Sequence, residues 1–153
     1  MRRLLLFGIC LLPLVVFGFA NDALAGQTDG INGEGGRPFT TTLAGANEVP
    51  SAAGSDLTGT AKVTINLGQH ELCWDLDYTT TQVVTAAHIH KGVAGVANQP
   101  LVPFFNNKQV ANSGCREVDQ AVLEDIAENP TSYYVNVHTT AHPAGAGRGQ
   151  LTK

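Results

Sequence analysis

The sequence has little serine, the nucleophile of the common hydrolase triads. Serine is rare after residue 25, and none of the serines lies in a Gly-x-Ser-x-Gly motif. They are Ser51, Ser55, Ser113 and Ser132. No glycine-rich phosphate-binding motif occurs either. The chain therefore gives no sign of a catalytic serine triad or of a nucleotide-binding loop.

Positive charge is scarce as well. Lysine and arginine number 9 against 13 aspartates and glutamates, which gives a net charge of −4 at pH 7. This acidic balance argues against nucleic acid or an anionic membrane surface as a partner. No apolar run long enough to cross a bilayer follows residue 25. No internal repeat or heptad pattern is present, which argues against solenoids and coiled coils.

The first 25 residues predict a signal peptide. Met1-Arg2-Arg3 is a basic start, residues 4–20 are apolar, and Ala23-Leu24-Ala25 has the form of a cleavage site. Cleavage after Ala20 is an alternative. An uncleaved anchor is a second one, because the apolar run approaches spanning length, but Pro13 and the small residues at its exit favour cleavage. We therefore expect a secreted or periplasmic protein that is not inserted in the membrane after cleavage.

Cysteine is limited to three residues, and Cys10 lies inside the predicted signal peptide. Cleavage leaves the pair Cys73 and Cys115, which in an exported protein predicts a disulfide. Closing the loop of about forty residues stabilises a fold by roughly 3–4 kcal/mol on the loop-entropy model. A metal-ligand role for the pair is less favoured because there is no Cys-x-x-Cys spacing.

The rest of the chain predicts one β domain. Residues 26–38 are rich in glycine and predict a flexible leader, and residues 39–153 form the domain. Alternating apolar residues and turn signals predict strands at 39–43, 58–67, 70–78, 83–90, 101–105, 133–138 and 149–151. A helix is predicted at 119–128, capped by Asp119 and ended by Asn129-Pro130. The fold class is therefore all-β, an immunoglobulin-like or Greek-key β-sandwich or barrel with one short crossover helix.

Three histidines are the best candidates for a functional site. His88 and His90 leave a strand on the same face, and Ile89 leaves it on the opposite face. His138 ends a later predicted strand. Neutral imidazole is a common ligand of copper and zinc, so this pattern predicts a mononuclear copper or zinc site. His142, four residues after His138, or a water molecule is expected at a fourth position.

A purely structural interpretation stays open beside this one. His88 and His138 are then hydrogen-bonded packing residues that fasten the loops around them. His70 is interpreted as a surface residue beside a hairpin turn. The segment Asn47-Glu48-Val49-Pro50 is interpreted as turn chemistry, with its asparagine and proline setting backbone angles.

Four ordered motifs resemble those of the CHRD domain, a module repeated in chordin and found singly in many exported microbial proteins. They are Thr42-Leu43-Ala44-Gly45-Ala46-Asn47-Glu48-Val49-Pro50, Ala86-Ala87-His88-Ile89-His90-Lys91-Gly92, Tyr134-Val135-Asn136-Val137-His138-Thr139 and Arg148-Gly149-Gln150-Leu151. The resemblance covers about residues 40–151. One departure is Gly147, where the family usually has an apolar residue.

The resemblance implies an all-β fold related to the barrel of the copper/zinc superoxide dismutases. By that analogy His88, His90 and His138 are carried over as metal ligands, and Arg148 lies where those enzymes keep an anion-guiding arginine. No histidine occurs between His90 and His138, so their bridging imidazole is absent, and no cluster that would build their zinc subsite is present.

We therefore expect an exported binding or interaction module. Its expected partner is an extracellular protein or a surface ligand, and its candidate cofactor is one copper or zinc ion. The alternative is a copper-dependent redox enzyme of the superoxide dismutase type. The two classes can be told apart, because a redox enzyme needs a metal with an open coordination position and an interaction module needs none.

Overall fold

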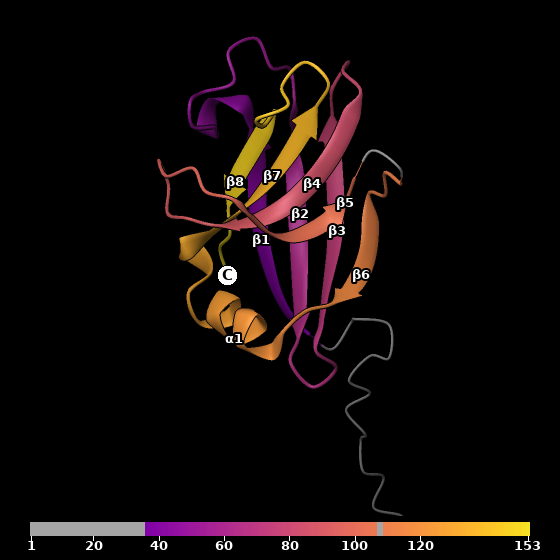
Figure 1. The fold of residues 1–153 in the computed structure, drawn as a ribbon, viewed down its shortest axis with the longest axis vertical. Coiled ribbons are helices and arrows are strands. Elements are labelled where there is room, and N and C mark those ends of the chain that lie inside the picture. The colour runs from indigo at the N-terminus through magenta and orange to yellow at the C-terminus, as the bar shows by residue number, and fades with distance from the viewer. Residues whose placement is uncertain (1–35, 107–108) are drawn as a thin grey trace, which may run out of the picture.

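The structure is a computed structural model that describes residues 36–106 and 109–153. The predicted signal peptide and residues 26–35 of the predicted leader lie outside the described residues. Eight strands form one antiparallel sheet that curls into a nearly closed barrel (Figure 1). They are β1 (Arg37–Ala44), β2 (Thr58–Asn66), β3 (Glu71–Thr79), β4 (Val84–Lys91), β5 (Pro100–Phe105), β6 (Ser113–Glu117), β7 (Tyr133–Thr139) and β8 (Gly147–Gln150). The predicted all-β fold class is confirmed.

Three short helices complete the described chain. They are η1 (Gly45–Asn47), α1 (Gln120–Glu128) and η2 (Pro130–Ser132). The carboxylate of Asp119 accepts a hydrogen bond of 2.9 Å from the backbone N–H of Ala121, so the predicted cap of the α-helix is confirmed. No helix in the described part of the chain combines the length and apolar character that crossing a bilayer requires.

The strand order is β5-β4-β7-β8-β1-β2-β3-β6. The helix α1 connects β6, at one edge of the sheet, to β7, which lies between β4 and β8. It therefore is the crossover element that the sequence predicts, and it lies at one end of the barrel (Figure 1). The rings of Trp74 in β3 and Phe104 in β5 stack with their centroids 5.0 Å apart and their planes within 1°. This contact joins the edge strand β5 to β3, which is next to the opposite edge of the sheet.

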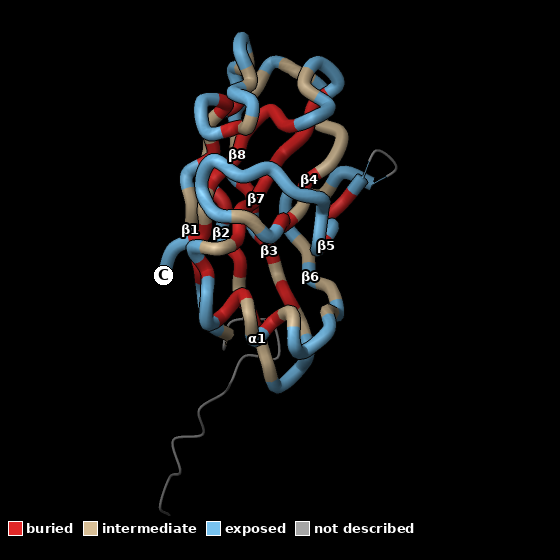
Figure 2. The backbone as a smooth tube through the Cα atoms, turned by 60° about the vertical axis from the view of Figure 1, so that its left-hand side comes forward, coloured by how far each residue is buried: buried red, intermediate tan, exposed pale blue. Residues whose placement is uncertain are grey.

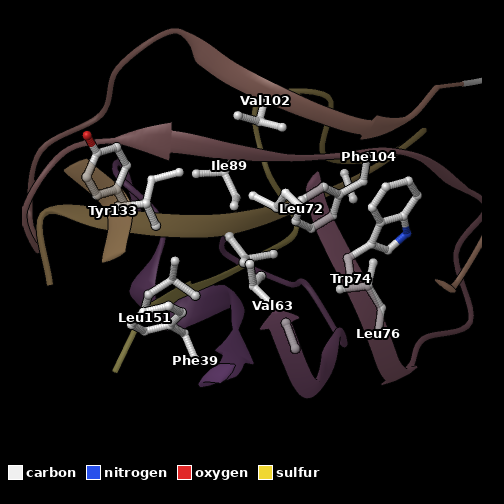
Figure 3. Close-up of a cluster of buried hydrophobic side chains, with 14 of the residues drawn as sticks. Phe39, Val63, Leu72, Trp74, Leu76, Ile89, Val102, Phe104, Tyr133 and Leu151 are labelled. Atoms are coloured by element: carbon white, nitrogen blue, oxygen red, sulfur yellow. The ribbon is translucent and has the colours of Figure 1, made fainter. Parts of the chain in front are cut away.

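The core forms because apolar residues alternate along the strands. On β2 Ala61, Val63 and Ile65 are buried, whereas Lys62 between them is exposed. The same alternation on β3 and β4 brings Leu72, Trp74, Leu76 and Ile89 into one cluster (Figure 3). Burying one side chain of this size stabilises a fold by roughly 1.5–3 kcal/mol, so the cluster defines which face of each strand points inward.

The strand β6 was not predicted, because its residues Ser113–Glu117 show no alternation of apolar and polar side chains. It is an edge strand, and its pairing with β3 places Cys73 directly opposite Cys115. The two cysteines form a disulfide, as predicted. The covalent bond and the backbone pairing thus hold a strand that has little apolar surface of its own.

Two strands begin two residues earlier than predicted, and the other predicted boundaries differ by at most one residue. β1 begins at Arg37, so the last two residues of the predicted leader pair with β2. β8 begins at Gly147, which pairs with Val137 of β7. A Cβ atom at Gly147 would lie 2.1 Å from Cδ2 of Leu57. Leu57 therefore fills the space that an apolar side chain at residue 147 would need, and the strand pairs without that side chain.

The first prediction concerns the disulfide. Mass spectrometry of the unreduced protein should find no free thiol at Cys73 or Cys115. Reduction should lower the melting temperature by roughly 5–15 °C, because it releases a loop closed over a sequence separation of 42 residues. Two cysteines that react with an alkylating reagent in the native protein would contradict the pairing.

Candidate metal centre

Strands β4 and β7 bring three histidines together on the outer face of the sheet. Ile89 is fully buried in the core, so His88 and His90 on either side of it point outward. In the paired strand His138 lies opposite Ala86 and so joins them on the same face. The potential ligand atoms of the three imidazoles lie within 4.8 Å of one another. The structure therefore assembles the three histidines that the sequence singled out.

Loops cover this outer face while the core covers the inner one, so every residue of β7 is buried (Figure 2). The β4–β5 loop places the carbonyl of Asn98 2.8 Å from Nδ1 of His90. The β7–β8 loop places the carbonyl of Pro143 3.0 Å from Nδ1 of His138. His90 is only 5% exposed, so the centre lies beneath loops rather than on an open surface.

These contacts assign the tautomers of two rings. A carbonyl oxygen only accepts, so Nδ1 of His90 and Nδ1 of His138 carry protons and donate them, which leaves a lone pair on each Nε2. Nε2 of His138 accepts from Nδ1 of His88 at 3.0 Å. Nε2 of His90 is buried and has no hydrogen-bond partner among the described residues.

Burial also keeps the imidazoles neutral. It lowers the pKa of His88 to about 4, and the neighbouring His138 and His90 add to this effect. Burial likewise lowers the pKa values of His90 and His138, and their hydrogen bonds to carbonyls offset this only in part. The three rings are therefore neutral at pH 7, which is the protonation state that binds a metal ion.

The other histidines lie outside this cluster. His142 is half-buried in the β7–β8 loop, where its backbone N–H donates to the hydroxyl of Thr139 at 3.1 Å. It does not belong to the three-histidine group. His70 is exposed in the turn between β2 and β3, where its backbone has a φ of 54°.

Arg148 is buried, and its donors face the protein. Its guanidinium donates to the carbonyls of Val96 and Val93, each at 2.9 Å. It also lies 3.4 Å from the ring centroid of Tyr134, whose ring in turn stacks on His90 with centroids 4.7 Å apart. Arg148 therefore fastens the β4–β5 loop over the centre. This position does not suit the anion-guiding role that the resemblance suggested, because the side chain is 2% exposed.

Glu48 is a residue that the sequence interpretation missed. The segment around it does turn, as predicted, but the side chain of Glu48 is buried. Both carboxylate oxygens accept from Nδ2 of Asn136, at 2.9 and 2.8 Å. Gly145 covers the pair with a φ of +146°, and a Cβ atom there would lie 2.5 Å from the carboxylate. The sequence gives no signal for this burial, because a glutamate in a turn is ordinarily exposed.

The environment of Glu48 changes its acidity. Burial raises its pKa from 4.5 to about 7, and the hydrogen bond from Asn136 and the charge of Arg148 offset this only in part. Glu48 is the one acidic residue that is buried among the described residues. Its hydrogen-bond partner Asn136 is paired with His88, so Glu48 is linked through Asn136 to the strand pair that carries the three histidines.

Comparison with known proteins identifies the domain. A family model described as the CHRD domain matches residues 39–151. No curated protein and no solved structure matches the chain.

The second prediction concerns the stability of this buried carboxyl group. The folded state holds a proton on Glu48 up to about pH 7, whereas the unfolded chain releases it near pH 4.5. Stability should therefore fall as the pH rises through this window, by roughly 1–3 kcal/mol in total. Glu48→Gln should lack this fall and should be the more stable protein at pH 8. Urea unfolding at pH 5 and pH 8 measures the effect, and parallel pH profiles of the two proteins would contradict it.

Proposed function

The chain belongs to the CHRD-domain family, and we propose that it is an exported binding module that holds one copper or zinc ion through His88, His90 and His138. One observation carries the metal site. Nε2 of His90 is buried without a hydrogen-bond partner among the described residues. Buried polar atoms nearly always have a partner, so a histidine kept only for packing would be expected to use both ring nitrogens.

The orientation of the rings supports this proposal. Metal-binding histidines commonly donate one N–H to a carbonyl, which fixes the ring and directs the other nitrogen at the ion. His90 does this through Asn98, and His138 does it through Pro143. The loops that cover the centre therefore also orient its ligands, through these two carbonyls.

The distance between the other two ligand atoms also fits a shared ion. Nδ1 of His88 lies 3.0 Å from Nε2 of His138. Two nitrogens bound at about 2.0–2.1 Å to one ion lie about 2.9–3.4 Å apart for angles between square and tetrahedral. For Nδ1 of His88 to hold an ion, its proton would move to Nε2 of the same ring, which keeps this ligand neutral and which the half-buried ring permits. Neutral imidazoles without a thiolate suit copper or zinc.

Export and the interaction role are supported by other features. A disulfide persists in an oxidising compartment, which agrees with the signal peptide predicted from residues 1–25. The negative net charge of the chain favours a protein or a surface ligand over nucleic acid as the partner. A bound ion would supply a Lewis acid with an open coordination position, and copper would add a one-electron couple.

A copper-dependent redox enzyme is the second candidate, because His88 is half-buried and leaves the centre partly accessible. We expect copper-loaded protein to dismutate superoxide only slowly. The sequence has no histidine between His90 and His138 to bridge a second ion, and the donors of Arg148 are engaged by carbonyls. Pulse radiolysis tests this third prediction. A near-diffusion-limited rate that Arg148→Ala abolishes would favour the enzyme.

The fourth prediction concerns metal binding itself. At pH ~7.5 the protein should bind one equivalent of Cu(II) or Zn(II), measured by calorimetry and by metal analysis. His90→Ala should weaken the affinity by roughly tenfold or more, because it removes a ligand whose orientation is fixed. Since burial lowers the pKa values of the ligands, the ion should be retained until the pH falls to about 5.

Two other histidines provide controls for this prediction. His70→Ala removes an exposed imidazole, and His142→Ala removes one outside the cluster, so both should leave the affinity unchanged. If the histidines serve packing alone, His88→Ala and His138→Ala lower stability by about 1–3 kcal/mol without any effect on metal binding. Equal affinity in the wild type and in the His88→Ala/His90→Ala double variant would rule out the site.

A further inference from the structure

The three proposed ligands are all neutral, which leaves the charge of a bound ion uncompensated within the ligand set. A charge beneath covering loops is poorly solvated, so an opposite charge nearby has a strong effect on its stability. Among the described residues Glu48 is the only buried carboxylate. The ligand cluster itself consists of the three histidines, so Glu48 is not one of the grouped ligand atoms.

The strand register places Glu48 beside the centre. Asn136 is the direct neighbour of His88 across the β4–β7 pair, and it precedes His138 by two residues on the same face. The carboxylate of Glu48 is held 2.8 and 2.9 Å from the amide nitrogen of Asn136. The carboxylate is therefore hydrogen-bonded to a residue whose neighbours on the same face are two of the three ligands. The free oxygen of that amide, Oδ1 of Asn136, is buried and unpartnered among the described residues.

The charge of Glu48 is not cancelled by a direct ion pair. Arg148 is the nearest buried cation, but its guanidinium is bound to the carbonyls of Val93 and Val96 and stacks on Tyr134. No salt bridge joins it to Glu48 in the described chain. The carboxylate is instead held by a neutral amide and is covered by Gly145.

We propose that Glu48, held by Asn136, compensates the charge of the bound ion and sets the preference of the centre for a divalent over a monovalent ion. This inference rests on the proposed metal site. By Coulomb's law the attraction is proportional to the charge of the ion, so Glu48 stabilises Cu(II) about twice as much as Cu(I) in free energy. The residue thus acts on the oxidation state of copper without touching it.

The test is the midpoint potential of the copper-loaded full-length protein at pH ~8, where Glu48 is ionised. Glu48→Gln keeps the shape of the side chain and removes its charge, so it should weaken Cu(II) binding by roughly a hundredfold and Cu(I) binding by roughly tenfold. The ratio of the two changes tenfold, which raises the potential by about 59 mV for a one-electron couple. Glu48→Ala should raise it similarly.

The control is Glu117→Gln, which removes the same charge from an exposed position on β6 and should leave the potential unchanged. Competition with chelators of Cu(I) and Cu(II) gives the two affinities separately. Equal weakening of both oxidation states, with an unchanged potential, would show a merely structural role for Glu48 and overturn this inference alone. A wild-type protein that binds no copper ion would overturn the proposed metal site, and the role of Glu48 with it.

Discussion

The pairing of β4 with β7 is the constraint on which the rest of the site depends. Side chains alternate between the two faces of a strand, so a slip of one residue would move Ile89 out of the core and His88 and His90 into it. The burial of Ile89 and Val135 on the inner face opposes such a slip. The free energy that packs the core therefore also holds the imidazoles in register on the other side of the same strands.

A polar site on the outside of a barrel needs a separate cover. The loops after β1, β4 and β7 provide it, and each is attached to the outer face by a hydrogen bond to a different side chain. The carboxylate of Glu48 accepts from the amide of Asn136, the carbonyl of Asn98 accepts from His90, and the carbonyl of Pro143 accepts from His138. Removing water from the rings lowers their pKa values and leaves them neutral, so the same burial that orients the imidazoles keeps them in the metal-binding state.

Arg148 shows how tertiary contacts decide the role of a charged side chain. The resemblance suggested an anion-guiding arginine, yet its guanidinium is enclosed by Val93, Val96 and Tyr134. Two carbonyls and an aromatic face satisfy a guanidinium well, because it is planar and weakly hydrated. The cation thereby fixes the β4–β5 loop, which carries the carbonyl that orients His90.

The sequence by itself determined the all-β fold, the disulfide partners and the grouping of His88 with His90, because two-residue periodicity and cysteine count are local signals. It also indicated His138, through the position of that residue in a later strand. It did not indicate β6, whose residues lack alternation, or the roles of Glu48 and Arg148. Those roles arise where loops far apart in the chain fold over one face, and burial, hydrogen bonding and local charge exist only after that contact is made. Tertiary structure alone decided them, because the pKa of a carboxyl group and the partners of a guanidinium depend on what surrounds them in space.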